Sequence, residues 1–574
     1  MRLQLSKSAN ATSLYIVKST YDRNGKRSNK VVRKLGTLAE LSMKYEDPVA
    51  WGKAIAEQMT QEEEEAKVAP VSVTYDPGML IEKGQRNTYN VGYLFLQKIY
   101  HELKLDHICK EIEKEHEFTY DLNEIMKCLV YGRVIYPGSK ARTCEEAKNY
   151  LEGIHCQQHQ VYRALSVLAE ESDTIQSKLY QSSKDIFRRN DKILYYDCTN
   201  FFFEIEEEKG SRKYGRGKEH RPNPIVGMGM FMDGDGIPLA LCVYPGNENE
   251  QLTLKPLEKK IIQDFGHSKF ILCTDAGLSG KEMRLYNAYQ DRAFLTVQSI
   301  KKMEQPKQQW ALDPSGWMLP GSNRKYDLEE ILSDPEKEDA YYNAIFYKEQ
   351  TWMKDGIEQR YIVSFSLKYK SYLEHIRSNQ IERAKKLIEN GRSRKNNPND
   401  PGRFVEQLYF DENGEIVDRS AAVLNEERIQ QEKKYDGFYC VATNLDGDIQ
   451  KILEINARRW EIEESFRIMK TDFRSRPVYL QRDDRIMAHF LTCFIALYLY
   501  RILEKKLGER FTTDSILQTL RSMNCVEIPR EGYIPAYMRT DLTDALHESF
   551  GFRTDCQILP LSESRKIVRN TKTH

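Results

Sequence analysis

A succession of apolar, strand-like runs that begins at Lys192 constrains the fold of this chain more than any other feature. The first, Ile193–Ile205 (ILYYDCTNFFFEI), is the continuous apolar pattern of a buried strand. Two similar runs, Pro224–Met232 and Ile237–Tyr244, flank Asp-Gly-Asp-Gly, a hairpin turn signal. Helix and strand patterns then alternate: Gln251–Phe265, Lys269–Thr274, Ser279–Gln290 and Ala293–Val297. This order predicts an α/β fold with a mixed sheet flanked by helices.

The rest of the chain divides into regions with different sequence patterns. Ser13–Leu35 predicts two strands around a polar Asp-Arg-Asn-Gly-Lys turn, and an acidic helix is expected near Val49–Lys67. Residues 301–435 have short strand patterns such as Tyr361–Phe365 and one charged helix, Tyr369–Glu389. The expected domains are 1–85 (hairpin and helix), 86–190 (helical), 191–300 (first part of the core), 301–435 (inserted, strand-rich), 436–508 (second part of the core) and 509–574 (C-terminal region).

Charge is balanced overall but uneven along the chain. The 574 residues include 86 Lys+Arg and 86 Asp+Glu, so the net charge does not indicate a nucleic-acid partner. However, Lys209–Arg221 has six basic residues and one acid. Such a local patch can follow a phosphate backbone, which makes Arg212, Lys213 and Arg216 candidate DNA contacts. A solvated hairpin tip is the alternative.

Cysteine usage and the longest apolar run indicate a soluble chain in a reducing compartment. The eleven cysteines include no Cys-x-x-Cys pair, which fits reduced thiols and a cytoplasmic location. The motif His155-Cys156-x-x-His159 suggests a metal site, but no second ligand cluster of zinc type follows it, so a structural role is favoured. The 15-residue run Ile486–Tyr500 is short for a membrane span and predicts a buried helix with no membrane role.

Two aspartates stand at the ends of apolar runs. Asp197 follows Ile-Leu-Tyr-Tyr, and Asp275 follows Phe-Ile-Leu-Cys-Thr. Burying a carboxylate is costly unless it is paired or bound to a metal ion. Taken singly, each aspartate is also explained as a helix cap or a turn residue.

A third acid lies on a predicted helix far downstream, in Asn456–Lys470. With 100° per residue, Arg459, Glu463 and Lys470 share one face, while Glu461 and Glu464 point well away from it. This face combines an acid that can ligate a metal ion with cations that can hold phosphate. When the helix is taken alone, an Arg–Glu ion pair on a solvated surface is the favoured interpretation.

Together these residues resemble a known family. Thr274-Asp-Ala-Gly-Leu-Ser-Gly280, Arg459-Trp-Glu-Ile-Glu-Glu-x-Phe466 with Lys470, and Gly246-Asn-x-x-Glu250 are similar to motifs of bacterial insertion-sequence transposases of the DDE type. The resemblance covers about residues 191–507. It implies an RNase H-like core, and Asp197, Asp275 and Glu463 as the catalytic, metal-binding triad. Arg459 and Lys470 match the basic residues of the Tyr-Arg-Glu-Lys signature, whereas its Tyr is replaced here by Asn456, a candidate phosphate contact.

The resemblance implies a transposase that binds terminal inverted repeats, cuts at the transposon ends and joins the 3′-hydroxyl to target DNA. Three acids suit two Mg²⁺ ions, or Mn²⁺, that activate the nucleophile and stabilise the leaving oxygen. The expected partner is double-stranded DNA, with a homodimer in the synaptic complex and nucleoid association when bound. Region 86–190 is a candidate DNA-binding domain, although helical packing alone also explains it. Two alternatives stay open: an RNase H-like endonuclease without strand joining, and a non-enzymatic DNA-binding protein.

Two tryptophans of region 301–435 also invite a functional interpretation. Trp310 and Trp317 could stack on an unpaired base. Packing in a local core is the favoured interpretation.

Overall fold

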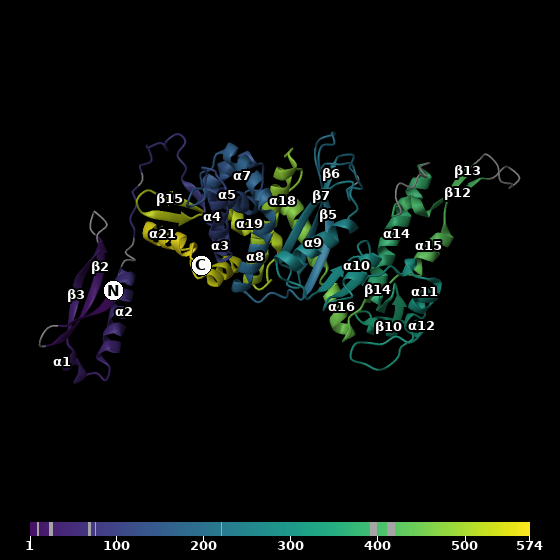
Figure 1. Cartoon of the computed structure of the whole chain (residues 1–574), viewed down its shortest axis with the longest axis horizontal. Helices are drawn as coiled ribbons and strands as arrows, with labels where there is room; N and C mark the ends of the chain where they lie inside the picture. Colours follow the sequence, from purple (N-terminus) through teal and green to yellow (C-terminus); the bar gives the residue numbers. More distant parts are fainter. Residues whose placement is uncertain are drawn as a thin grey trace. The chain divides into compact units, whose positions relative to one another are not determined.

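The computed structural model describes residues 1–7, 11–21, 27–66, 71–74, 76–219, 221–390, 399–409 and 420–573. It forms two compact units, residues 1–85 and 86–574. Helices and strands are mixed, and a large mixed sheet is present (Figure 1), which confirms the predicted α/β class. The further domain boundaries expected within residues 86–574 remain predictions.

The first unit is a small antiparallel sheet followed by helices. Its elements are β1 (Arg2–Lys7), β2 (Thr12–Tyr21), β3 (Arg27–Thr37), α1 (Leu38–Ser42) and α2 (Pro48–Ala66). The two expected strands are β2 and β3, which pair with each other, and β1 adds an edge that the pattern did not predict. Leu14 and Ile16 of β2 are fully buried, because alternate residues of this strand point inward. The expected turn, residues 22–26, lies outside the described residues.

The second unit begins with a helical region, as expected. Its elements are β4 (Thr88–Asn90), α3 (Tyr93–Glu102), α4 (Leu105–Glu115), α5 (Leu122–Ile135), α6 (Lys140–Glu146), η1 (Ala147–Asn149), α7 (Gln158–Glu170) and α8 (Ser172–Ile186). The C-terminal elements return to it: α19 (Thr513–Ser522), β15 (Asn524–Ile528), β16 (Gly532–Pro535), α20 (Asp541–Phe550), β17 (Leu559–Pro560) and α21 (Leu561–Asn570). Strand β15 pairs with β4, so residues far apart in sequence share one small sheet, β17-β16-β15-β4.

The largest sheet of the described chain has eight strands in the order β10-β11-β14-β9-β8-β5-β6-β7. Their bounds are β5 (Ile193–Phe202), β6 (Ile225–Asp233), β7 (Pro238–Pro245), β8 (Ile271–Thr274), β9 (Ala293–Val297), β10 (Ile345–Lys354), β11 (Ile357–Ser366) and β14 (Phe438–Thr443). β5, β8 and β9 are parallel, and the other pairs are antiparallel. The turn between β6 and β7 is the predicted Asp-Gly-Asp-Gly hairpin, in which Asp233 accepts hydrogen bonds from the amides of Asp235 and Ile237.

The two faces of this sheet bury different residues of the same strand. Leu194, Tyr196 and Cys198 of β5 pack with α9 (Gln251–Asp264) in one cluster, whereas Tyr195 and Phe201 belong to the large core cluster on the other face. That second face is covered by α16 (Ile449–Ala457), α17 (Trp460–Arg467) and α18 (Asp483–Lys506). The short elements α10 (Lys281–Tyr286) and η4 (Ile468–Asp472, a π-helix) complete the core.

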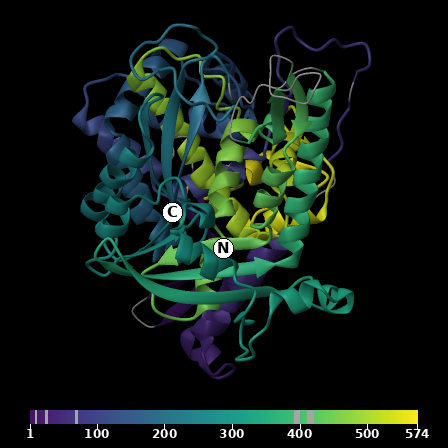
Figure 2. The ribbon, with the colours of Figure 1, turned by 90° about the vertical axis from the view of Figure 1, so that its right-hand side faces the viewer.

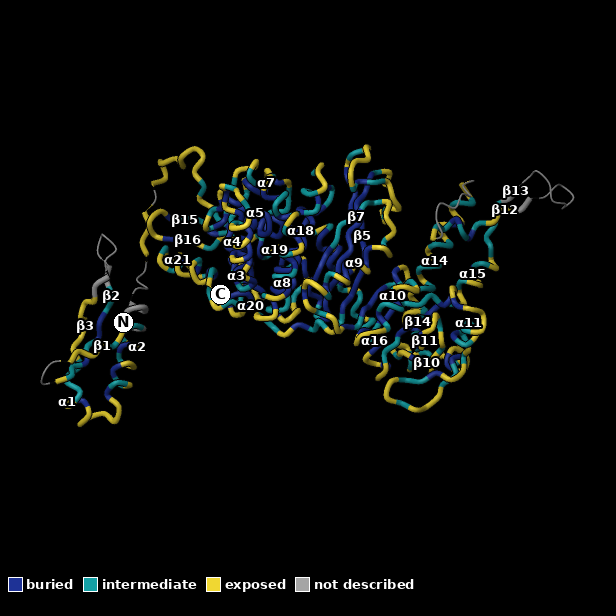
Figure 3. The backbone as a smooth tube through the Cα atoms, in the orientation of Figure 1, coloured by how far each residue is buried: buried dark blue, intermediate teal, exposed yellow. Residues whose placement is uncertain are grey.

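The apolar run near residue 490 forms the centre of the second unit. α18 contacts α3, α5 and α7 of the helical region (Figure 1) and is buried along most of its length (Figure 3). By length and hydropathy it could cross a membrane, yet 94% of its most apolar 18-residue window is buried. A helix that is apolar all round is expected inside a large core as well as in a membrane, and here neighbouring helices and the sheet cover it.

Residues 301–435 differ from the inserted strand-rich subdomain that the sequence suggests. Two of their strands, β10 and β11, extend the central sheet beyond β14 instead of forming a sheet of their own; Figure 2 views the molecule from this end. Much of the rest is helical: η2 (Ile300–Lys302), α11 (Gln305–Leu312), α12 (Leu328–Leu332), α13 (Pro335–Ala340), α14 (Leu367–Glu389), η3 (Pro401–Phe404) and α15 (Glu426–Lys433), with a small hairpin of β12 (Val405–Tyr409) and β13 (Ser420–Leu424). The apolar face of β11 packs on residues of β14 and α11, which explains why it joins the sheet.

Both tryptophans of this region pack within its core. Trp317 is fully buried and donates its indole N–H to the carbonyl of Asp313 at 2.9 Å. Trp310 lies edge-on to Trp352, with ring centroids 4.8 Å apart. The packing interpretation is therefore confirmed.

Candidate active site

Asp197 of β5 lies beside Asp275, which directly follows the end of the parallel strand β8. β5 and β8 pair in a register that aligns Tyr196 with Thr274, so the next residue in each segment is an aspartate. Adjacent strands are about 4.8 Å apart, and side chains in register point to the same face. The residues two positions earlier, Tyr195 and Cys273, both belong to the large core cluster, so the two carboxylates point toward the face covered by α17.

Glu463 approaches the same face from α17. Tyr195 donates its hydroxyl to the carbonyl of Ile455 in α16 at 2.7 Å, and Ser465 contacts the sulfur of Met232 at 3.5 Å. These contacts hold α16 against β5, the strand of Asp197, and α17 against the neighbouring strand β6. Glu463 is on the outer side of α17, where 57% of its side chain is exposed. The helix is thus held by buried groups while its acid faces open space.

The three acids line one pocket of about 420 Å³. Acids and cations are nearly balanced in its lining. The acids are Asp197, Glu219, Asp275 and Glu463, and the cations are Lys218, Arg459, Arg467, Lys470 and Arg476. The structure therefore brings together the three acids and two of the basic residues that the sequence singled out, Arg459 and Lys470.

The two aspartates are oriented by backbone amides. One oxygen of Asp197 accepts from the amide of Cys198 at 2.8 Å, and one oxygen of Asp275 accepts from the amide of Leu278 at 2.9 Å. The second oxygen of each carboxylate remains to act as a ligand. Carboxylate oxygens are the donors that Mg²⁺ and Mn²⁺ prefer, so this donor set fits a hard divalent cation.

Glu463 is drawn toward a cation of its own helix. Its carboxylate lies 3.2 Å from the guanidinium of Arg459. The three acids do not form a group whose oxygens all lie within 4.8 Å of one another. A spread of this kind suits two ions side by side, about 3.5–4 Å apart, better than one ion held by all three acids.

Burial sets the electrostatics of the pocket. Asp197 is 9% exposed, and this burial raises the pKa of its carboxyl to about 6, despite the opposing charge of Lys218. Burial likewise lowers the pKa of Lys470 to about 8, and repulsion from Lys218 adds to the shift. The Lys470 ammonium donates to the hydroxyl of Thr199 at 2.6 Å. Neither charge has an ion-pair partner among the described residues.

The helix with Glu463 is not the continuous helix expected over Asn456–Lys470. The amides of Arg459, Glu461 and Ile462 bond three residues back, which makes a tight turn between α16 and α17. A π-helix follows at Ile468–Asp472. The uniform rotation of 100° per residue, which was assumed for Asn456–Lys470, therefore does not hold on either side of α17. Asn456 falls before the break and donates to the hydroxyl of Tyr439 at 3.3 Å, outside the pocket lining.

The predicted basic loop is only partly available for DNA. Arg212 is 4% exposed, because its guanidinium packs over Phe203 and donates to the carbonyl of Lys209 at 3.3 Å. It is thus withdrawn as a candidate contact. Lys213 pairs with Glu208 at 3.5 Å, whereas Arg216 is exposed. None of the three lines the acidic pocket.

The structure adds pocket residues that the sequence did not single out. Lys218 belongs to the same basic stretch, and its ammonium donates to the carbonyl of Cys198 at 2.6 Å, beside Asp197. Arg467 and Arg476, which follow Glu463 in the sequence, also line the pocket. The run of basic residues around Lys218 was a visible signal. Nothing local marks Arg476, which reaches the pocket through the chain reversal after η4.

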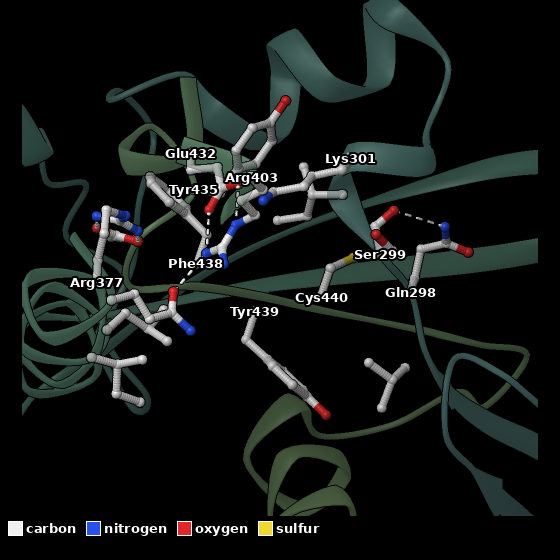
Figure 4. A pocket seen from close by; sticks show the side chains of 16 residues that line it. Gln298, Ser299, Lys301, Arg377, Arg403, Glu432, Tyr435, Phe438, Tyr439 and Cys440 are labelled. Carbon is white, nitrogen blue, oxygen red and sulfur yellow. Dashed lines mark hydrogen bonds and ion pairs between the residues drawn. The ribbon is translucent and has the colours of Figure 1, made fainter. Parts of the chain in front are cut away.

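A second cavity, of about 370 Å³, lies between α14, α15 and β14 (Figure 4). Two arginines of its lining pair with two acids, while Lys301 lies over the ring of Tyr435. Arg403 donates to both carboxylate oxygens of Glu432 at 3.0 Å, and Arg377 is bonded to both oxygens of Asp436. Because these charges satisfy each other, the cavity is best explained as a structural ion-pair network.

The comparison with known proteins identifies the same part of the chain. Residues 191–499, more than half of the sequence, match a family model described as the transposase DDE domain. None of the curated proteins matches the chain. A solved structure described as the cryo-EM structure of a piggyBac transposase synaptic complex with hairpin DNA is similar with a TM-score of 0.35 and 8% identity, over 86% of this chain and 88% of that one. At this TM-score we draw no conclusion from the likeness.

Proposed function

We propose that this chain, which belongs to the transposase DDE domain family, is the transposase of an insertion sequence. It would bind terminal inverted repeats, cut the DNA at the ends of the element and join the freed 3′-hydroxyl to target DNA. One observation carries the proposal. The strand register sets Asp197 beside Asp275, in a pocket that also holds Glu463 and five cations.

The catalytic core would be RNase H-like. The antiparallel run β5-β6-β7 followed by the parallel strands β8 and β9, with helices on both faces, supports this assignment. The extension by β10 and β11 would be an addition to that core.

The acids would hold two divalent cations, Mg²⁺ or Mn²⁺. Such ions, when bound, activate the attacking oxygen and stabilise the leaving oxygen of a phosphodiester. Asp197 and Asp275 are oriented for this by their backbone hydrogen bonds. Glu463 would exchange its ion pair with Arg459 for a ligand role, which frees the guanidinium for a DNA phosphate.

The cations of the pocket would position the DNA backbone. Lys470 and Arg459 stand on either side of Glu463 in sequence and line the same pocket. A partly desolvated ammonium such as Lys470 interacts strongly with a phosphate, because the surrounding dielectric is low. These residues would hold the scissile phosphate against the acids, and positioning together with charge neutralisation supplies most of the acceleration.

A neighbouring cavity extends the cationic surface toward the helical region. It measures about 530 Å³, shares Arg476 with the acidic pocket and includes Arg142 and Arg474. Its described lining contains no carboxylate, and Tyr479 in it is 72% exposed. We place the DNA strand leaving the active site along this path, with phosphates on the arginines and a base on the tyrosine.

The remaining parts of the proposal follow from the reaction. Two transposon ends are processed together, so a homodimer is expected in the synaptic complex, with double-stranded DNA as ligand of both copies. The helical region 86–190 would contribute to recognition of the ends. The protein would act in the cytoplasm, on the nucleoid.

Strand joining is the decisive test. The full chain is mixed with DNA carrying the element's terminal repeats, a precleaved 3′-hydroxyl end, target DNA and Mg²⁺. Joined products that disappear in Asp197→Asn support the transposase. Hydrolysis without joining points to an endonuclease, and binding without either reaction points to a DNA-binding protein.

A further inference from the structure

Three cysteine sulfurs meet in the helical region of the second unit, away from the acidic pocket. Cys128 is on α5, Cys144 is on α6, and Cys156 is in the segment just before α7. The Cys156 sulfur lies 3.2 Å from that of Cys128 and 3.4 Å from that of Cys144. All three sulfurs are within 4.8 Å of one another. Among the described residues, these cysteines are the one group of three or more His, Cys, Asp or Glu side chains whose ligand atoms all lie this close together.

Apolar packing accounts poorly for this arrangement. The two sulfur–sulfur distances are shorter than the roughly 3.5–4.0 Å of ordinary contacts between carbon atoms, although sulfur is the larger atom. Thiol hydrogen bonds satisfy the two contacts only if Cys156 donates to one neighbour and accepts from the other, because each thiol has a single hydrogen. A cation at the centre would accept lone pairs from all three sulfurs and remove this repulsion.

The distances match what a tetrahedral thiolate site requires after a small expansion. Zinc–sulfur bonds of about 2.3 Å place two sulfurs of a tetrahedron about 3.8 Å apart. Moving the sulfurs outward by a few tenths of an ångström reaches that separation. Cys128 and Cys144 are buried, whereas Cys156 is partly exposed, so a water molecule can complete the fourth position on its side.

A buried cation beside the cluster supplies the matching charge. Lys140 is 6% exposed, and its ammonium has no hydrogen-bond partner among the described residues. Burial and the charge of Arg133 lower the pKa of Lys140 to about 7, and Cys493, Cys128 and Cys144 oppose this shift. An uncompensated buried ammonium is costly. Three thiolates around a divalent cation carry a net charge of −1, which would compensate this ammonium.

We propose that Cys128, Cys144 and Cys156 bind a structural Zn²⁺ ion that ties α5, α6 and the segment before α7 together. Thiolate sulfurs select zinc over the hard cations that suit carboxylates. Of the motif around Cys156 only the cysteine takes part, and the other two ligands come from two helices, at spacings that no sequence motif encodes. None of the three cysteines lines the acidic pocket.

Metal content of the purified full chain tests the proposal. The protein is produced with zinc in the medium and dialysed into Mg²⁺ buffer, and zinc is then measured by mass spectrometry. We expect about one zinc ion per chain, and less than about a tenth of that in Cys128→Ser, Cys144→Ser and Cys156→Ser. Cys109→Ser is the matched control, because Cys109 is also buried in the same region but outside the cluster; it should keep its zinc.

Two further measurements keep the result decisive. Asp197→Asn combined with Asp275→Asn should retain zinc, which separates this site from the acidic pocket and from the proposed function. Cobalt loaded into wild-type protein should show thiolate-to-metal charge-transfer bands, a readout that does not depend on variants that fold poorly. The proposal is overturned if wild-type protein holds no zinc and gives no such bands, if zinc survives loss of the cysteines, or if thiol titration finds two of the sulfurs joined in a disulfide.

Discussion

The acidic pocket and the cavity beside α14 are similar in volume, about 420 and 370 Å³, and both contain carboxylates and cations. They differ in how the charges are paired. Beside α14, Arg403 and Arg377 are each bonded to an acid. In the acidic pocket, Arg459 pairs with Glu463 and Arg476 with Glu219. Asp197 and Asp275, however, accept from backbone amides, and Lys470 donates to a hydroxyl. We expect a bound cation or phosphate to partner these three charges.

Neutralising an aspartate should produce the largest effect. In Asp197→Asn or Asp275→Asn we expect DNA cleavage and joining to fall by at least about 10³-fold, since about 4 kcal/mol of charge stabilisation in the transition state is lost. Initial rates on labelled transposon-end DNA measure this. Asp436→Asn, from the other cavity, should cleave at the wild-type rate per folded molecule. Equal losses from both cavities would remove the functional difference between them.

Breaking the paired cavity should change stability instead of activity. Asp436→Ala leaves the guanidinium of Arg377 partly buried without its carboxylate, and only 3% of the Asp436 side chain is exposed. We expect the free energy of unfolding to fall by about 3 kcal/mol. Denaturant titration followed by circular dichroism measures this, together with Arg377→Ala and the double variant. Unchanged stability in all three would show that the ion pair contributes nothing.

Two buried lysines offer a matched pair. Lys470 and Lys348 both have a pKa lowered to about 8, mainly by burial, and both donate to a neutral oxygen. Only Lys470 faces the acids. We expect Lys470→Met to slow cleavage by about 10- to 100-fold through loss of a phosphate contact, while Lys348→Met leaves the rate per folded molecule unchanged. Similar losses in both would point to a general effect of removing a buried charge.

Acid should weaken metal binding through Asp197. Because burial raises its pKa to about 6, the carboxyl is protonated below that pH and must lose the proton to bind a cation. The metal concentration for half-maximal cleavage should rise about fivefold between pH 6 and pH 5, because the ionised fraction of a carboxyl with this pKa falls from about a half to about a tenth. For the stability of the metal-free protein, the pH dependence has the opposite sign. The stabilisation from protonated Asp197 is full below its ordinary pKa of 3.8 and is lost as the pH rises through about 6. Thermal melts at several pH values check this. Asp197→Asn, which cannot titrate at this position, is the control and should lack this part of the pH dependence.

The smallest effect is expected in the basic loop. Arg216 is exposed, so Arg216→Ala should weaken DNA binding a few-fold and reduce the salt dependence by about one phosphate contact. Arg212 is buried over Phe203, so Arg212→Ala should leave the salt dependence unchanged and lower stability. Fluorescence anisotropy with DNA at several salt concentrations distinguishes the two. A salt slope altered by Arg212→Ala alone would reverse this assignment.

Local pattern predicted the strands of the central core and drew attention to acids that line one pocket. The apolar runs predicted β5 to β9, and an acid at the end of two of them pointed to the site. Pairing register is a long-range property, so the order of residues alone could not place Asp197 beside Asp275. The tight turn between α16 and α17 was invisible, because no Gly or Pro marks it, so the helix expected over Asn456–Lys470 is broken where the sequence pattern predicted continuity. Likewise, the meeting of Cys128, Cys144 and Cys156 depends on how three elements pack.

The attachment of β10 and β11 to the central sheet has a consequence for how the chain can be shortened. β11 satisfies the outward-facing backbone groups of β14 over Arg360–Phe365. Excising residues 301–435 would leave β14 as a bare edge, separated by β9 alone from β8, the strand that ends at Asp275. Bare edges recruit other chains. A trimmed protein would therefore be expected to aggregate before it lost any residue of its acidic pocket.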